Sequence, residues 1–123
     1  MSLRVSYSLV LFLIASWVAA AAKYDFNVGW KDVNPDGRRM RKAVAINNQW
    51  PNPTIRVRKG ETLSVRVTNS LGSQETSLHW HGLFQRGTNQ YDGPPRVVGC
   101  SIPPGMSFTY EFKVDQPGTY WCV

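Results

Sequence analysis

The chain has 123 residues, of which 42% are hydrophobic and 18% charged, and its formal net charge is +6 at pH 7. This length accommodates one domain with a single small core, and this composition excludes an intrinsically disordered chain. The charge excess is modest and does not by itself indicate a polyanionic partner.

The N-terminal 22 residues combine a basic residue, an apolar run and a small-residue tract. Arg4 precedes the apolar run from Leu9 to Val18, and Ala20-Ala21-Ala22 supplies the small residues of a cleavage site. Ser16 interrupts the run, which is shorter than the roughly 20 apolar residues of a membrane span. We therefore expect a signal peptide at 1–22, a single domain at 23–123, secreted or otherwise extracytoplasmic localisation, and no membrane span in the mature chain.

Short β-type runs separated by Gly, Pro and Asn follow, and no segment shows a sustained helical period. Apolar and polar residues alternate most clearly over Phe108 to Val114 and over Leu63 to Val67, as in strands with one buried face. The spacing predicts an all-β Greek-key sandwich or barrel. The predicted strands are Tyr24 to Trp30, Arg41 to Ile46, Thr54 to Arg58, Thr62 to Thr68, Ser77 to Gly82, Ser107 to Val114 and Thr119 to Val123.

A basic cluster, Arg38, Arg39, Arg41 and Lys42, follows the first predicted strand. Such a cluster can bind nucleic acid or another anionic surface. It lies, however, in a polar connection that begins Asn34-Pro35-Asp36-Gly37, which is typical of a turn. Because a secreted protein does not meet nucleic acid where it works, we expect a solvated loop and no nucleic-acid partner.

The only two histidines stand in the sequence Leu78-His79-Trp80-His81-Gly82. On a strand, His79 and His81 project from one face and Trp80 from the other. Two imidazoles on one face suit a transition metal, although the same pattern also occurs in rings that only pack or hydrogen-bond. Two ligands do not complete a zinc site, which needs four protein ligands or three with an open position.

A stretch of about twenty residues with little strand character, Leu83 to Ile102, begins directly after the second histidine. Long connections without secondary structure in small domains are usually functional. Its position next to the histidines favours a functional loop.

The sequences SLHWHGLFQ, at 77–85, and GTNQYDGP, at 87–94, resemble the first copper-binding segment of multicopper oxidases. The resemblance continues through CSIPPG at 100–105, YEF at 110–112, DQPGTYW at 115–121 and INNQWPNP at 46–53, and so covers nearly all of the chain after residue 22. The sequence GLFQ is similar to that of fungal laccase-like and ferroxidase-like members. The resemblance implies an N-terminal, plastocyanin-like domain with the cupredoxin form of the Greek-key β-sandwich.

The resemblance also implies copper as cofactor, with His79 a ligand of the type 2 copper and His81 of a type 3 copper. In the family, the type 2 and type 3 coppers form a trinuclear cluster. This cluster reduces dioxygen to water with electrons from a phenolic or ferrous-iron substrate. Asp92 matches a carboxylate that assists proton delivery, although Asp-Gly is equally a common turn pair. Cys100 matches a cysteine that pairs with one in a later domain, so we do not expect a bond from Cys100 to Cys122.

The family pattern continues beyond Trp121 with an aromatic residue and a second His-x-His, where this chain reads Cys122-Val123. We therefore expect a C-terminally incomplete copper-binding domain that is inactive alone as an oxidase. One alternative is a non-catalytic β-domain that acts in copper binding or partner interaction. Another is a free-standing electron-transfer cupredoxin, which is disfavoured because no histidine follows either cysteine.

Overall fold

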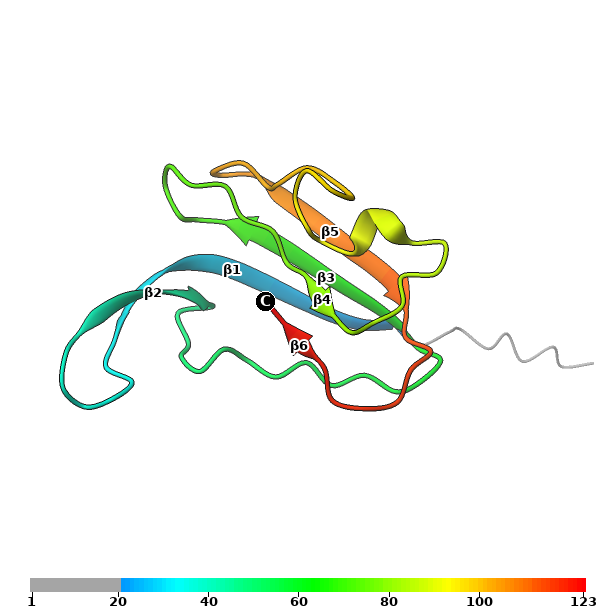
Figure 1. Ribbon diagram of the computed structural model, residues 1–123, viewed down its shortest axis with the longest axis horizontal. Helices are drawn as coiled ribbons and strands as arrows, with labels where there is room; N and C mark the ends of the chain where they lie inside the picture. The colour runs from blue at the N-terminus through cyan, green and yellow to red at the C-terminus, as the bar shows by residue number, and fades with distance from the viewer. Residues whose placement is uncertain (1–20) are drawn as a thin grey trace, which may run out of the picture.

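The computed structural model describes residues 21–123, which form two β-sheets on either side of one hydrophobic core (Figure 1). The larger sheet has four strands in the order β2-β1-β3-β5, and the smaller sheet pairs β4 with β6. This arrangement confirms the predicted all-β fold. The elements are β1 (Ala21–Val33), β2 (Arg41–Ile46), β3 (Thr62–Asn69), β4 (Trp80–His81), the short 3₁₀ turn η1 (Asn89–Tyr91), β5 (Ser107–Lys113) and β6 (Trp121–Cys122).

The four-stranded sheet is mixed. β1 pairs antiparallel with β2 and parallel with β3, and β3 pairs antiparallel with β5. A parallel pair needs a crossover connection, which here is residues 34–61, a range that includes β2. The register places Val65 of β3 between Tyr24 of β1 and Tyr110 of β5.

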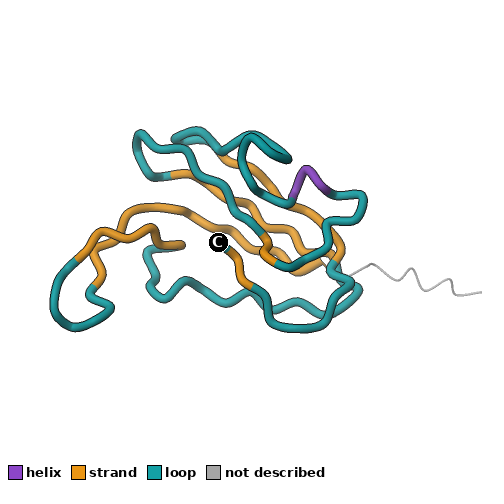
Figure 2. Tube along the Cα trace, in the orientation of Figure 1, coloured by secondary structure: helices purple, strands orange, loops and turns teal. Residues whose placement is uncertain are grey.

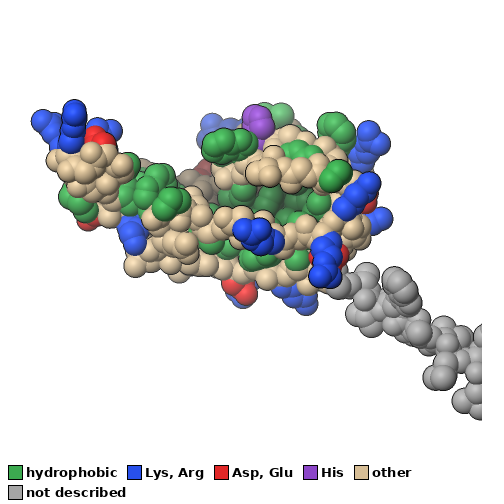
Figure 3. All heavy atoms as spheres, turned by 90° about the horizontal axis from the view of Figure 1, so that it is seen from below, with side chains coloured by type: hydrophobic (Ala, Val, Ile, Leu, Met, Phe, Trp, Pro, Cys, Tyr) green, Lys and Arg blue, Asp and Glu red, His purple; other side chains and the backbone are tan. Residues whose placement is uncertain are grey.

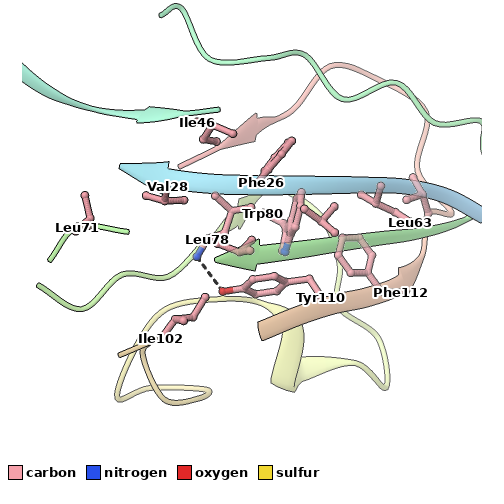
Figure 4. Packing of buried hydrophobic residues seen from close by; sticks show 13 residues of the cluster. Phe26, Val28, Ile46, Leu63, Leu71, Leu78, Trp80, Ile102, Tyr110 and Phe112 are labelled. Carbon is pink, nitrogen blue, oxygen red and sulfur yellow. Dashed lines mark hydrogen bonds between the residues drawn. The ribbon is translucent and has the colours of Figure 1, made fainter. Parts of the chain in front are cut away.

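Alternation along β3 and β5 builds the core. Leu63, Val65 and Val67 are buried, as are Tyr110 and Phe112 on the neighbouring strand. From the smaller sheet, Trp80 packs edge-to-face on Tyr110 and Phe112, with ring centroids 5.7 and 5.2 Å apart (Figure 4). Full burial of a large apolar side chain stabilises a fold by roughly 1.5–3 kcal/mol, so this contact holds the two sheets together.

The one buried polar side chain among the described residues is Asn69, at the end of β3. Its Nδ2 donates to the carbonyls of Gln74 and Ile102, at 2.7 and 2.8 Å, and its Oδ1 accepts from the N–H of Leu71 at 2.9 Å. These hydrogen bonds satisfy the buried amide and tie the end of the long 83–102 connection to the larger sheet.

The predicted strand at Thr54 to Arg58 is wrong. The segment is extended, and Ile55 and Val57 pack against the core, but no strand pairs with it within residues 21–123 (Figure 2). The hydroxyl of Tyr24 accepts a hydrogen bond from the N–H of Arg56 at 2.9 Å and donates one to its carbonyl at 2.8 Å. The Tyr24 hydroxyl therefore forms hydrogen bonds with the N–H and carbonyl of Arg56, to which a neighbouring strand would otherwise bond.

Two predicted strands are shorter in the structure, and one residue predicted to face the core is partly exposed. The strands expected at Ser77 to Gly82 and at Thr119 to Val123 shorten to the two-residue strands β4 and β6. Phe108, predicted to face the core, is 39% exposed, and it contacts the rings of Tyr110 and Tyr91 at the edge of the core.

The predicted signal peptide lies outside the described residues except for Ala21 and Ala22, which begin β1. In the part of the chain that the structure describes, none of the helices has the length and apolar character of a membrane span.

Candidate metal centre

The two histidines lie on the face of the smaller sheet that points away from the core. Trp80 and Cys122 form a cross-strand pair that packs into the core, so the residues beside them point outward. The imidazole rings of His79 and His81 have centroids 5.6 Å apart and an interplanar angle of 72°. His79 is partly buried and His81 is exposed.

The backbone of His79 forms an antiparallel hydrogen-bonded pair with Val123. Its N–H donates to the carbonyl of Val123 at 2.6 Å, and the N–H of Val123 donates to the carbonyl of His79 at 3.0 Å. His81 lies opposite Trp121 in the same ladder. Since cross-strand partners share a face, the exposed side chains of Trp121 and Val123 flank the imidazoles.

The hydrogen bond of His79 determines its tautomer. Its Nδ1 lies 2.7 Å from the main-chain carbonyl oxygen of Asp92. A carbonyl oxygen only accepts, so Nδ1 carries a proton, and in the neutral ring this tautomer presents the lone pair of Nε2. In metal sites, a hydrogen bond on the ring nitrogen that does not bind the metal orients the ligating histidine.

Asp92 reaches His79 from the 83–102 connection. The same carbonyl also accepts a hydrogen bond from the N–H of Trp80 at 3.3 Å, so it binds both the ring and the strand. The Asp92 carboxylate is farther away, with Oδ1 3.6 Å from Nδ1 of His79, beyond hydrogen-bond distance. The main chain of Asp92 is therefore the group that orients the ring, and its carboxylate stands beside it.

Gly93 allows this close approach. Its φ is +103°, and a Cβ built on it would lie 1.9 Å from the carbonyl oxygen of Leu78 and 2.7 Å from Cα of His79. No side chain fits in that space, so only glycine lets the 83–102 connection lie against the backbone of Leu78 and His79.

Two further side chains, Tyr110 and Gln116, hold the segment around the histidines in place. The N–H of Leu78 donates to the hydroxyl of Tyr110 at 2.9 Å (Figure 4), and burial raises the pKa of that hydroxyl. On the other side, Oε1 of Gln116 accepts from the N–H of Phe84 at 2.5 Å, and its Nε2 donates to the carbonyl of Gly82 at 3.2 Å. The connection between β5 and β6 is thereby attached to the residues that follow His81.

The cysteines do not complete a metal site. Both are free, Cys100 is exposed, and the Cys122 thiol faces the core, where burial raises its pKa to about 12. No group of three or more His, Cys, Asp or Glu side chains within residues 21–123 is placed to hold a metal ion. The two imidazoles are donors that suit copper and lie on an accessible face, and within the described residues they are two ligands without a third.

Sequence reasoning identified the histidine pair, the adjacent loop and Asp92, and the structure brings all three together. It did not identify the main-chain role of Asp92, the steric role of Gly93 or the support from Tyr110. The Asp-Gly pair signals a turn, but no local pattern signals what that turn packs against.

Comparisons with known proteins identify the family of the chain. The family model described as "Multicopper oxidase" matches residues 27–122. The iron transport multicopper oxidase fetC of Epichloe festucae is 54% identical over 103 residues, which are 84% of this chain and 17% of that protein. The iron transport multicopper oxidase FET3 of Gibberella zeae is 50% identical over 118 residues, which are 94% of this chain and 19% of that protein.

A laccase of Trametes hirsuta is 41% identical over 124 residues, covering 93% of this chain and 24% of the laccase. Among solved structures, the crystal structure of Fet3p, a multicopper oxidase that functions in iron import, superposes with a TM-score of 0.80 at 39% identity. It covers 84% of this chain and 20% of that one. The chain therefore spans about a fifth of the length of the relatives that it matches.

Proposed function

Because the chain belongs to the multicopper oxidase family, as its N-terminal cupredoxin domain, we propose that it supplies two copper ligands to such an oxidase. His79 would bind the type 2 copper and His81 one of the type 3 coppers. When bound, copper supplies the one-electron redox chemistry that couples substrate oxidation to the reduction of dioxygen.

The observation that carries this proposal is the hydrogen bond from His79 Nδ1 to the carbonyl of Asp92. A ring that only packs does not need its tautomer set, whereas a metal ligand gains affinity when one nitrogen is held protonated and the other presented. His81 then adds a second imidazole on the same face, with a ring centroid 5.6 Å from the first.

For the whole protein we propose ferrous iron as the reducing substrate, on the strength of the iron transport oxidases at 54% and 50% identity. A phenolic substrate is the second candidate, supported by the laccase at 41% identity. The residues of this chain hold and orient the copper ligands. The carboxylate of Asp92, 3.6 Å from His79 Nδ1 and partly accessible, is the group we propose to hold a proton for delivery toward oxygen.

We also propose that the working location is extracytoplasmic, since the N-terminal segment has the composition of a signal peptide. The 123-residue chain alone should bind copper without oxidase turnover, because the described residues offer two imidazoles and no third ligand.

The outward face of β4 and β6 favours a second role in partner interaction. Trp121 and Val123 are 76% and 63% exposed and lie opposite His81 and His79 in the ladder. Exposed apolar side chains beside incomplete metal ligands suit a contact surface for the protein segment that brings the remaining ligands.

Copper titration tests the proposal. We expect the purified chain to bind copper with nitrogen hyperfine coupling in its electron paramagnetic resonance spectrum, and His79→Ala/His81→Ala to lose stoichiometric uptake. Asp115→Ala, at an exposed residue outside the site, serves as the control and should bind as the unmodified chain does. Near-ultraviolet circular dichroism verifies that each variant is folded. Stoichiometric copper binding by the folded double variant would place the metal elsewhere and contradict the proposal.

A further inference from the structure

The end of the β1–β2 hairpin, residues 30–44, projects from the body of the domain (Figure 1). We call these residues the arm. The arm has five cationic side chains against two anionic ones and so carries half of the chain's formal charge of +6. The cationic side chains are Lys31, Arg38, Arg39, Arg41 and Lys42, and the anionic ones are Asp32 and Asp36.

Most of this charge is not neutralised within the domain. Oδ1 of Asp36 accepts hydrogen bonds from the backbone N–H groups of Arg38 and Arg39, and its Oδ2 lies 3.8 Å from Arg41. Within residues 21–123, the side chains of Arg38, Arg39 and Lys42 make no hydrogen bond or ion pair. Asp36 therefore shapes the turn while leaving at least three cations free to meet an external anion.

The arm also exposes apolar side chains among these cations. Met40, which stands between Arg39 and Arg41, is 64% exposed. Trp30 and Val44 are cross-strand partners, 44% and 40% exposed. Figure 3 shows hydrophobic side chains on this part of the molecule, next to the basic cluster at its end.

The Trp30 side chain can enter a less polar environment with a small desolvation free energy. Its indole N–H donates to the carbonyl of Leu71 at 3.1 Å, so no donor is left unpaired when water is removed from the ring. The alternation along the hairpin places the cross-strand pair Lys42 and Asp32 on the same face as Trp30 and Val44. That face therefore presents an aromatic ring whose hydrogen-bonding needs are already satisfied, and the excess positive charge of the arm comes from Arg38 and Arg39 in the turn.

We propose that the arm binds the surface of a bilayer that contains anionic phospholipid. Arg38, Arg39 and Lys42 contact the lipid phosphates and carboxylates, while Met40 and Trp30 enter the interfacial layer. Basic residues near an anionic surface and aromatic or aliphatic side chains at the headgroup level are the two contributions to peripheral membrane binding. A nucleic acid or acidic polymer would use the cations but would offer no apolar phase to Met40.

Vesicle co-sedimentation of the full chain tests this proposal. We expect binding to phosphatidylcholine vesicles with about 30% phosphatidylserine, little binding to pure phosphatidylcholine, and loss of binding at about 500 mM salt. Each basic residue near such a surface contributes roughly a fivefold factor, so Arg38→Ser/Arg39→Ser should weaken partitioning about 30-fold. Met40→Ser should weaken it about fivefold, with no change in charge.

The matched control is Arg56→Ser/Lys59→Ser, which removes two exposed cations that form no ion pair within residues 21–123, at the opposite end of β1, where β3 begins beside Ala21. We expect it to change partitioning less than about threefold. An equal loss in the control would show that only net charge matters and would overturn the proposal. Unchanged partitioning of Met40→Ser, together with displacement by heparin, would make the arm a site for acidic polymers and would also overturn it.

Discussion

The hydroxyl oxygen of Tyr110, on β5, accepts a hydrogen bond from the backbone N–H of Leu78, one residue before the first histidine, at 2.9 Å. This contact crosses from one sheet to the other, and both residues are buried. The position of the histidine strand therefore depends on a side chain of the opposite layer.

Tyr110→Phe should destabilise the domain by about 1–3 kcal/mol, because it leaves a buried N–H without an acceptor. Urea unfolding followed by circular dichroism measures the change. The control is Tyr120→Phe, since the Tyr120 hydroxyl bonds to the carbonyl of Pro117 at an exposed site, and it should cost less than about 1 kcal/mol. If the two variants lowered the free energy of unfolding equally, the hydrogen bond to Leu78 would stabilise the domain no more than an exposed one does.

Gly93→Ala should destabilise the domain by about 3–4 kcal/mol, through the clash with Leu78 and the left-handed φ. It should also weaken copper binding, because the Asp92 carbonyl moves with its neighbour. Gly37→Ala is the control, with a φ of +71° and nothing within 4 Å of the added Cβ, and it should cost about 1–2 kcal/mol without affecting copper. Thermal unfolding measures the stability of each variant, and copper titration measures its affinity for copper. A Gly93 variant with native stability would refute the close packing of the connection on the strand.

Asp92→Asn should change the copper affinity of the chain by less than about threefold. The main-chain carbonyl that holds His79 is retained, and the carboxylate is beyond hydrogen-bond distance of the ring. A carboxylate that oriented the ligand directly would cost about 10–100-fold on removal. Competition titration with a copper chelator distinguishes these values, and a loss in the larger range would show that the carboxylate orients His79.

The two thiols should differ sharply in reactivity, because the thiolate is the reactive form. Cys100 is exposed, whereas burial raises the pKa of Cys122 from 9.0 to about 12. At about pH 8 we expect one fast-reacting thiol per folded chain and two in urea. Cys100→Ser should remove the fast phase, and rapid labelling of Cys122 in that variant would contradict its placement in the core.

The same burial makes the stability depend on pH. The fold favours the neutral thiol of Cys122, so this contribution is fully present below pH 9.0 and is lost as the pH rises from there toward about 12. Urea unfolding across this range should show a smaller decrease for Cys122→Ser than for the unmodified chain.

The local sequence pattern was sufficient to predict the strands that bury one face against the core. The alternation in 62–68 and 107–114 predicted β3 and β5, and the spacing of His79 and His81 placed both rings on one side, because side-chain direction follows the backbone period. The family motifs added the cupredoxin form of the sandwich, which the structural similarity to Fet3p confirms.

The short β-type run at 54–58 was also predicted to be a strand, but it does not pair. Pairing depends on which backbone lies alongside, and there the hydroxyl of Tyr24 bonds to the N–H and the carbonyl of Arg56. Likewise, the sequence predicted a loop after His81 and singled out Asp92, but only the tertiary structure decided that the main-chain carbonyl of Asp92 meets His79. That contact joins residues 13 positions apart, and it depends on Gly93 fitting against Leu78. Periodicity determines which way a side chain points, whereas its neighbour across space is decided by the packing of the whole core.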